Sequence, residues 1–178
     1  NTHTIHHDGV TMHFLNFPIL YTPTFAHPDW TVKRKSGFLT PSISVGKETG
    51  LTWKQPYFLN ISNSKDYTIT PIIFSKSGYL TDLEYRSIGE NSSLKSNIIG
   101  GRVDTFKKQD EEVISGFLTF DSMSENNWKT NVILQDSSED SFLRKYKLTN
   151  ETILKSSLST QKLDDESFSS VELYKIGS

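Results

Sequence analysis

Apolar and polar residues alternate with a period of two along most of the chain from Ser36 onward. Such alternation is typical of β-strands whose two faces meet different surroundings. Residues 47–50 and 76–78 read as hairpin turns between successive alternating runs. The pattern therefore predicts an antiparallel sheet built from hairpins, with almost no helix.

The alternation assigns an apolar and a polar face to each expected strand. In residues 39–45, Ile43 and Val45 fall on one face and Ser42 on the other. In residues 79–86 the charged side chains of one face are Asp82, Glu84 and Arg86. We interpret the face that carries Ser42, Asp82, Glu84 and Arg86 as the lining of a water-filled interior.

The second half of the chain alternates less regularly. We expect further strands at residues 92–103, 113–120, 127–135, 143–148, 153–163 and 168–176. The adjacent Gly100 and Gly101 predict a bend or a bulge in the first of these strands. Acidic or mixed loops are expected between the later strands.

The residues before Ser36 differ in composition from those that follow. Short strands are expected at residues 5–7, 10–15 and 17–24, punctuated by prolines. Proline is tolerated at strand starts, edges and bulges. A boundary near residues 28–35 therefore predicts two domains, residues 1–30 and 31–178.

Composition and charge exclude several classes of protein. Hydrophobic residues make up only 34% of the 178 residues, but the 12% aromatic content argues against disorder. No run approaches the roughly 18 apolar residues that a membrane helix needs. A net charge of -2 leaves no basic footprint for nucleic acid, and the absence of cysteine removes disulfides and thiolate chemistry.

The sequence shows no recognisable set of catalytic or metal-binding residues. The five histidines are His3, His6, His7, His13 and His27. His6 and His7 would point to opposite faces of a strand, and no carboxylate cluster supports the other histidines as zinc ligands. No Ser/His/Asp set, carboxylate pair or phosphate-binding loop has a meaningful spacing. We therefore expect no enzyme activity, no metal and no cofactor.

The alternating pattern by itself leaves more than one type of β-protein open. A small polar face opposite an apolar face with aromatic residues near the strand ends fits a transmembrane β-barrel. A soluble periplasmic or surface β-domain alternates equally well, and could bind a carbohydrate or protein partner through Trp30, Trp53 and Trp128. A barrel enzyme that modifies lipids is a third possibility, but the histidines lie upstream of the expected barrel.

Five motifs follow one another at hairpin spacing between Phe17 and Arg86. They are FPILYTPTF at residues 17–25, VKRKSGFLTP at 32–41, PYF at 56–58, DYTITP at 66–71 and EYR at 84–86. Together these motifs resemble the LptD family, the outer-membrane proteins that insert lipopolysaccharide into the outer leaflet. The resemblance is firm over the first half of the chain. Beyond Arg86 only the succession of strands and loops is similar, with a faint further match at residues 140–148.

The resemblance implies a fold, a location and partners. The expected fold is all-β, with antiparallel strands of a large transmembrane β-barrel preceded by the last strands of a periplasmic β-jelly-roll. Residues 1–30 would end the jelly-roll, and residues 31–178 would form the first, incomplete part of the barrel. The expected location is the Gram-negative outer membrane, with the N-terminal part in the periplasm. The implied partners are lipopolysaccharide, the plug lipoprotein LptE and the periplasmic bridge protein LptA.

The implied mechanism is passage of lipopolysaccharide through the barrel and a lateral seam beside its first strand. Proline removes a donor from the β-ladder, so Pro28 and Pro41 are our candidates for the lateral gate. Alternatively, these prolines only end or bend edge strands. Lys33, Arg34 and Lys35 could contact lipid A phosphates at the periplasmic rim, or could form a solvated basic turn.

Overall fold

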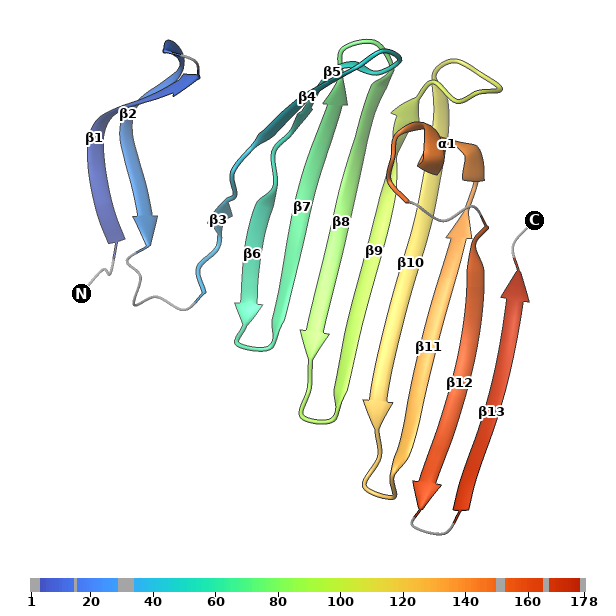
Figure 1. Cartoon of the computed structure of the whole chain (residues 1–178). Helices are drawn as coiled ribbons and strands as arrows, with labels where there is room; N and C mark the ends of the chain where they lie inside the picture. Colours follow the sequence, from blue (N-terminus) through green and yellow to red (C-terminus); the bar gives the residue numbers. More distant parts are fainter. Residues whose placement is uncertain (1–3, 15, 29–33, 150–152, 165–166, 177–178) are drawn as a thin grey trace. The chain divides into compact units, whose positions relative to one another are not determined.

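The chain forms two compact units, Asn1–Lys35 and Ser36–Ser178. The computed structural model describes residues 4–14, 16–28, 34–149, 153–164 and 167–176 (Figure 1). The division between the units lies beside the change in composition at residues 28–35. The assignment of residues 1–30 to a periplasmic domain and of residues 31–178 to a barrel stays a prediction.

Unit 1 contains one antiparallel pair of strands, β1 (Thr4–Phe14) and β2 (Phe17–Pro28). The two strands expected at residues 5–7 and 10–15 form a single strand up to Phe14, and residue 15 lies outside the described residues. Gly9, with φ of 65°, lies between the Asp8–Thr24 and Val10–Thr22 pairs. Glycine adopts this left-handed conformation without steric cost, which allows β1 to keep its pairing on both sides.

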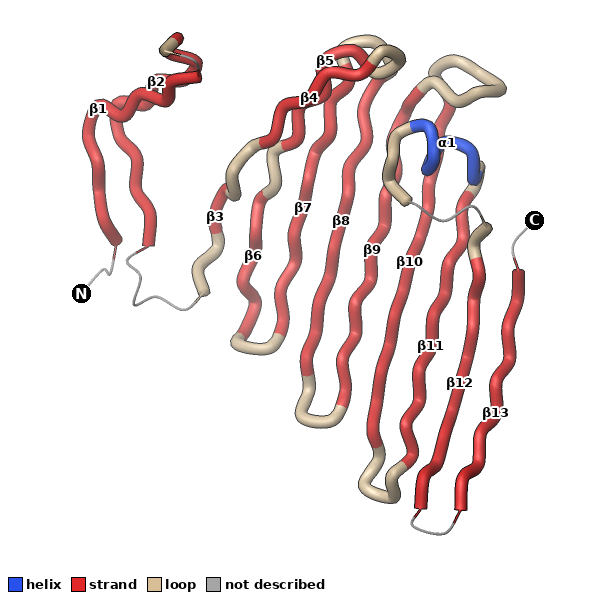
Figure 2. The backbone as a smooth tube through the Cα atoms, viewed as in Figure 1, coloured by secondary structure: helices blue, strands red, loops and turns tan. Residues whose placement is uncertain are grey.

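Unit 2 contains one eleven-stranded antiparallel sheet in the described part of the chain (Figures 1 and 2). Its strands are β3 (Gly37–Phe38), β4 (Ser42–Gly46), β5 (Gly50–Lys54), β6 (Tyr57–Ser62), β7 (Lys65–Phe74), β8 (Gly78–Ile88), β9 (Ser92–Val103), β10 (Glu111–Met123), β11 (Trp128–Ser137), β12 (Lys155–Asp164) and β13 (Ser167–Ile176). The all-β antiparallel fold predicted from the alternation is therefore confirmed.

The register of the sheet separates its side chains into two faces. Directly paired residues lie on the same face, so Thr70 and Asp82 share one face and Ile69 and Leu83 share the other. We call polar face the one that carries Ser42, Lys54, Thr70, Asp82, Glu84, Arg86, Lys95 and Asn97. We call apolar face the one that carries Ile43, Trp53, Ile69, Leu83, Ile98, Leu134, Leu158 and Leu173.

The apolar face is exposed on the isolated chain. Ile43 is 64% exposed and Leu83 is 41% exposed, although both sit in regular strands. Most large side chains of this face are exposed to a similar degree. An apolar surface of this extent is unusual for a soluble monomer and marks a region that meets another apolar medium or partner.

The prediction of a strand at residues 143–148 is wrong, because this segment begins with the short helix α1 (Asp140–Lys145). The Glu139 carboxylate accepts a hydrogen bond from the Ser141 N–H and caps the helix. Phe142 and Tyr146 are four residues apart and therefore lie on one side of the helical turn. No described helix has the length and apolar character needed to cross a membrane.

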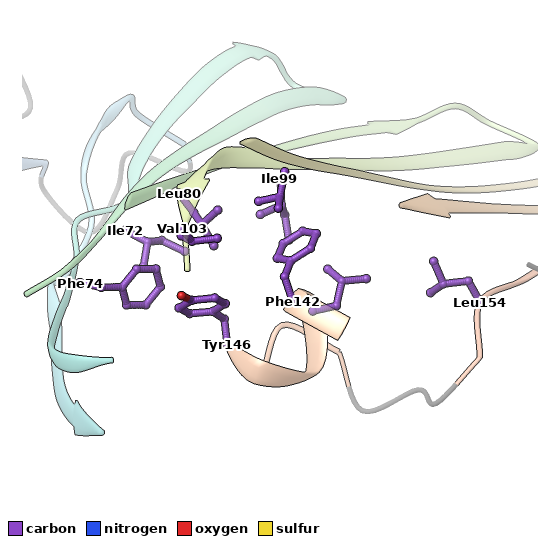
Figure 3. Packing of buried hydrophobic residues seen from close by; sticks show 10 residues of the cluster. Ile72, Phe74, Leu80, Ile99, Val103, Phe142, Tyr146 and Leu154 are labelled. Carbon is purple, nitrogen blue, oxygen red and sulfur yellow. The ribbon is translucent and has the colours of Figure 1, made fainter. Parts of the chain in front are cut away.

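The side chains of α1 and its flanks pack against one end of the polar face (Figure 3). The cluster consists of Ile72, Phe74, Leu80, Ile99, Val103, Val113, Phe142, Leu143, Tyr146 and Leu154. Phe142 is 0% exposed, and the ring centroids of Phe74 and Tyr146 are 4.7 Å apart. A helix of six residues is not stable alone in water, so this packing is what holds it.

The predicted alternative of a bulge at Gly100 and Gly101 is also wrong. The pairing of β9 with β8 and with β10 continues through both glycines without a shift in register. A Cβ on Gly101 would instead overlap the backbone carbonyl oxygen of Tyr79. The glycine therefore serves the close approach of the neighbouring strand.

We expect Phe142→Ala to destabilise the packing of residues 138–149 on the sheet by about 3–5 kcal/mol, because it leaves a cavity in a fully buried site. Thermal unfolding and protease cleavage within this segment would measure the effect. Ile153→Ala is the matched control, since Ile153 follows this segment and is 59% exposed. Equal effects of the two substitutions would contradict the role of this cluster.

Candidate functional site

Unit 2 starts with two long strands that are each interrupted (Figure 2). We call first strand the one formed by β3 and β4, and second strand the one formed by β5 and β6. Residues 39–41 separate β3 from β4, and residues 55–56 separate β5 from β6. Both interruptions contain a proline, Pro41 in the first and Pro56 in the second. Since β3 pairs with β6 and β4 pairs with β5, the two interruptions face each other across the sheet.

The register shows that the first strand contains one extra residue at the interruption. Phe38 pairs with Tyr57, and Ser42 pairs with Lys54. Three residues, 39–41, therefore face the two residues 55–56, which is the arrangement of a β-bulge. The predicted unbroken alternation over residues 39–45 consequently holds only from Ser42 onward.

Few polar contacts cross the interruption. The Leu39 N–H donates to the Pro56 carbonyl at 2.9 Å. The Gln55 side-chain amide donates to the Leu39 carbonyl, also at 2.9 Å. Pro41 and Pro56 have no N–H to contribute, so the ladder between the first two strands is weakest here.

The two predicted gate prolines lie in different sheets. Pro28 is the last residue of β2 and pairs with Thr4 in unit 1. Pro41 lies within the interrupted first strand of unit 2, between β3 and β4. The structure therefore does not bring the two prolines into one β-ladder, and it adds Pro56 as a neighbour of Pro41.

Sequence reasoning missed Gln55 and Pro56 as members of this site. A signal was available, because the Ser42–Lys54 pair belongs to a hairpin whose turn had been identified at residues 47–50. Counting one step outward from that pair puts residue 55 opposite Pro41. The bulge itself could not be counted in this way, since it depends on how β3 pairs with β6.

Charged side chains form a second feature, on the polar face. Arg86 Nε contacts Asp66 Oδ1 at 2.9 Å, and Lys95 Nζ contacts Glu84 Oε2 at 2.9 Å. The Asp66 side chain is only 4% exposed, and this ion pair gives its buried carboxylate a charged partner. A hydrogen bond from the Asn97 side chain to Asp82 completes the set.

Three of the four residues predicted to line an interior thus make polar contacts across β7, β8 and β9, which we call the polar network. Arg86 and Glu84 lie 3.5 Å apart and join the two ion pairs, and the Asp82–Asn97 hydrogen bond lies beside them. Ser42 shares their face, but lies on β4, outside the network. The network also includes Asp66, Lys95 and Asn97, which sequence reasoning did not select. These partners became visible only with the strand register.

The predicted basic contact is only partly within the described chain. Lys33 lies outside the described residues, while Arg34 and Lys35 end unit 1 with partly exposed and exposed side chains, respectively. Among the described residues no group of three or more His, Asp or Glu side chains could hold a metal ion.

A cavity of about 530 Å³ separates the end of α1 from the β4–β5 hairpin. Its lining includes Lys47, Lys54, Lys145 and Lys147, with Glu48 as the acidic side chain. The cavity opens on the polar face, because Lys54 and Thr52 belong to that face. It therefore adds positive charge beside the interrupted strands.

Three hydrogen bonds connect the α1 segment to the β9–β10 loop, and in one of them Lys145 Nζ donates to the Thr105 carbonyl at 3.2 Å. Lys107 Nζ contacts Glu139 Oε2 at 2.6 Å, and the Tyr146 hydroxyl donates to the Asp104 carbonyl at 2.8 Å. The hydrogen bond from Lys107, together with that from Ser141, lowers the pKa of Glu139. Burial raises the pKa of Tyr146, which favours its neutral, donating form.

Acid is expected to loosen the α1 segment through Glu139. Because the folded-state pKa of Glu139 is lowered, its contribution to stability is present above the ordinary value near 4.5 and is lost as the pH falls through the lowered value. Protease cleavage within residues 138–149, measured against pH, should rise in this acid range. In Glu139→Gln the acid-dependent rise should be smaller, and an unchanged profile would contradict the assignment.

The sequence of the chain is similar to the sequences of known proteins. No protein-family model matches the chain. The chain is 38% identical over 85 residues to the LPS-assembly protein LptD of Cupriavidus pinatubonensis, which covers 48% of the chain and 10% of that relative. It is 31% identical over 140 residues to the LPS-assembly protein LptD of Pseudoalteromonas translucida, which covers 76% of the chain and 18% of the relative.

A third relative, the LPS-assembly protein LptD of Pseudoalteromonas atlantica, is 30% identical over 128 residues, 72% of the chain and 17% of the relative. The aligned stretches span less than one fifth of the length of these relatives. Two of the alignments extend over more than two thirds of the chain, well beyond the motifs of its first half. The antiparallel all-β sheet agrees with this similarity, and the chain belongs to the LptD family of LPS-assembly proteins.

Proposed function

We propose that this chain supplies the first strands of an outer-membrane β-barrel that assembles lipopolysaccharide at the cell surface. The observation that carries the proposal is the proline-interrupted first strand at the edge of a two-faced antiparallel sheet. In the proposal, lipopolysaccharide leaves the barrel through a lateral seam beside β3 and β4. The names of the relatives support lipopolysaccharide assembly as the process.

The two-faced sheet supports a position within a membrane. Exposed apolar side chains would meet the acyl chains of the lipid, and the polar face would line a water-filled interior. Aromatic side chains lie on the apolar face toward both ends of the strands, Trp53 and Tyr79 at one end and Tyr67 and Tyr85 at the other. Such girdles are typical of outer-membrane barrels.

The polar face is the proposed route of the sugar part of lipopolysaccharide. Ser42, Asp82, Glu84 and Arg86 would line this route. A network of opposite charges presents both hydrogen-bond donors and acceptors, which suits passing hydroxyl and phosphate groups. None of these side chains is proposed to perform chemistry.

The interrupted first strand is the proposed lateral gate. Pro41 weakens the ladder within this strand, and Pro28 is kept as the second gate residue, in the strand that precedes it. Lys33, Arg34 and Lys35, in the segment between them, would contact lipid A phosphates as the lipid arrives. In this proposal residues 1–30 end a periplasmic jelly-roll and residues 31–178 begin the barrel.

The proposal also includes the partners implied by the family resemblance. LptE would plug the barrel, and LptA would deliver lipopolysaccharide from the periplasm. The location is the outer membrane of a Gram-negative bacterium, with the N-terminal part in the periplasm. Most of the residues that contact these partners would lie outside this chain, since it spans less than one fifth of its relatives.

Photocrosslinking in the protein as the cell makes it tests the proposed seam. A probe at Leu39 or Ile43 should crosslink lipopolysaccharide while it is being delivered, and a probe at Ser42 should report contact with the opposite face. Leu83 is the control, because it lies on the apolar face three strands away from β4. The seam would be abandoned if a correctly inserted protein gave no delivery-dependent crosslink at any of the three positions.

A pair of arginine substitutions tests whether the apolar face meets lipid. Leu83→Arg should reduce insertion into bilayers, because arginine near the middle of a membrane strand costs about 2–4 kcal/mol. Thr70→Arg is the matched control, since Thr70 lies on the next pair of the same two strands and faces Asp82. A soluble β-domain would tolerate Leu83→Arg, and that result would reject the barrel.

A further inference from the structure

The Gln55 side chain lies at the interruption of the first two strands, beside a position where the backbone ladder is incomplete. Paired residues in an antiparallel ladder that exchange hydrogen bonds make two, one in each direction. The Leu39 N–H donates to the Pro56 carbonyl at 2.9 Å. The return bond from residue 56 to the Leu39 carbonyl cannot form, because proline has no N–H.

The Gln55 amide supplies the donor that Pro56 lacks. Gln55 Nε2 lies 2.9 Å from the Leu39 carbonyl oxygen, and 3.4 Å from the Pro56 carbonyl oxygen. A side-chain amide is the same type of donor as a backbone N–H. The Leu39 carbonyl is therefore paired, although the backbone opposite it cannot pair it.

The backbone of Gln55 is hydrogen-bonded to β7, the next strand of the sheet. Its backbone N–H donates to the Pro71 carbonyl of β7 at 3.2 Å. Both flanking strands β5 and β6 also pair with β7. The residue is thus tied to the continuous part of the sheet, and only its side chain reaches across to the first strand.

We propose that Gln55 is a clasp that holds the interrupted first strand to the second by replacing the missing Pro56 N–H. A side chain can release one hydrogen bond by changing its rotamer, whereas a regular ladder requires several backbone bonds to separate together. Gln55 is a positioning residue that determines how readily residues 37–46 separate from β5 and β6. The consequence for lipopolysaccharide release rests on the proposed function, but the clasp itself is a property of the sheet.

The experiment combines Gln55→Leu with Pro56→Ala in the protein as the cell makes it, inserted in a bilayer. Hydrogen–deuterium exchange of a peptide covering residues 37–46 reports the pairing of the first strand. Gln55→Leu should accelerate exchange by about fivefold, the effect of one lost hydrogen bond. Gln55→Glu should do the same, because an ionised carboxylate has the same shape and cannot donate.

The decisive comparison is between Pro56→Ala alone and Pro56→Ala combined with Gln55→Leu. An alanine N–H at residue 56 can donate to the Leu39 carbonyl, so the added Gln55→Leu substitution should change exchange by less than about twofold. Gln135→Leu is the matched control, because Gln135 accepts from the Lys155 N–H between β11 and β12. It should loosen those strands and leave residues 37–46 unchanged.

Two outcomes would overturn the clasp. One is an unchanged exchange rate in Gln55→Leu, and the other is an equal acceleration with and without Pro56→Ala, which would mean that the side chain acts only through packing. Delivery of lipopolysaccharide to the cell surface is measured in parallel on the same variants. If the exchange results follow the expectation while delivery is unaltered, the seam is rejected and the clasp stands.

Discussion

The backbone hydrogen-bond ladder is the interaction on which the rest of unit 2 depends. Its eleven strands form a single sheet, and the only apolar core among the described residues lies where α1 covers one end of the polar face. Elsewhere no second layer buries the apolar side chains, so hydrophobic burial within the chain contributes little to holding most strands together. In the strands between the two edges, the ladder pairs backbone donors and acceptors on both sides, and internal pairing of the backbone is also the requirement for crossing a bilayer.

Because the ladder is the main interaction between the strands, a position that lacks a ladder hydrogen bond weakens the sheet locally. Pro41 and Pro56 remove donors from the first two strands at facing positions, and the extra residue of the bulge prevents a simple realignment. The Gln55 amide restores one bond at this point. In the proposed barrel, this combination makes the first strand weaker than its neighbours without leaving the Leu39 carbonyl unpaired.

The end of the sheet that α1 covers is held together differently. There the aromatic side chains of the α1 segment pack on an apolar part of the polar face, and the loop between β9 and β10 holds the segment through Lys107 and Asp104. The acidic and basic side chains of the network on β7 to β9 remain next to this apolar cluster. The polar face therefore combines a covered end with an open, charged stretch, in keeping with the proposed route for sugars.

The sequence alone determined most of the strands, their two faces and the resemblance to the family. A period of two is local, so the alternation of Thr70 and Asp82 with Ile69 and Leu83 can be read without any partner. It could not determine the helix at residues 140–145, because so short a helix forms only where Phe142 and the following Tyr146 pack on the apolar end of the sheet. Nor could it determine the bulge opposite Gln55, the charge partners of Glu84 and Arg86, or the role of Gly101. Each of these depends on which strands lie side by side and in which register, and only the tertiary structure decides that.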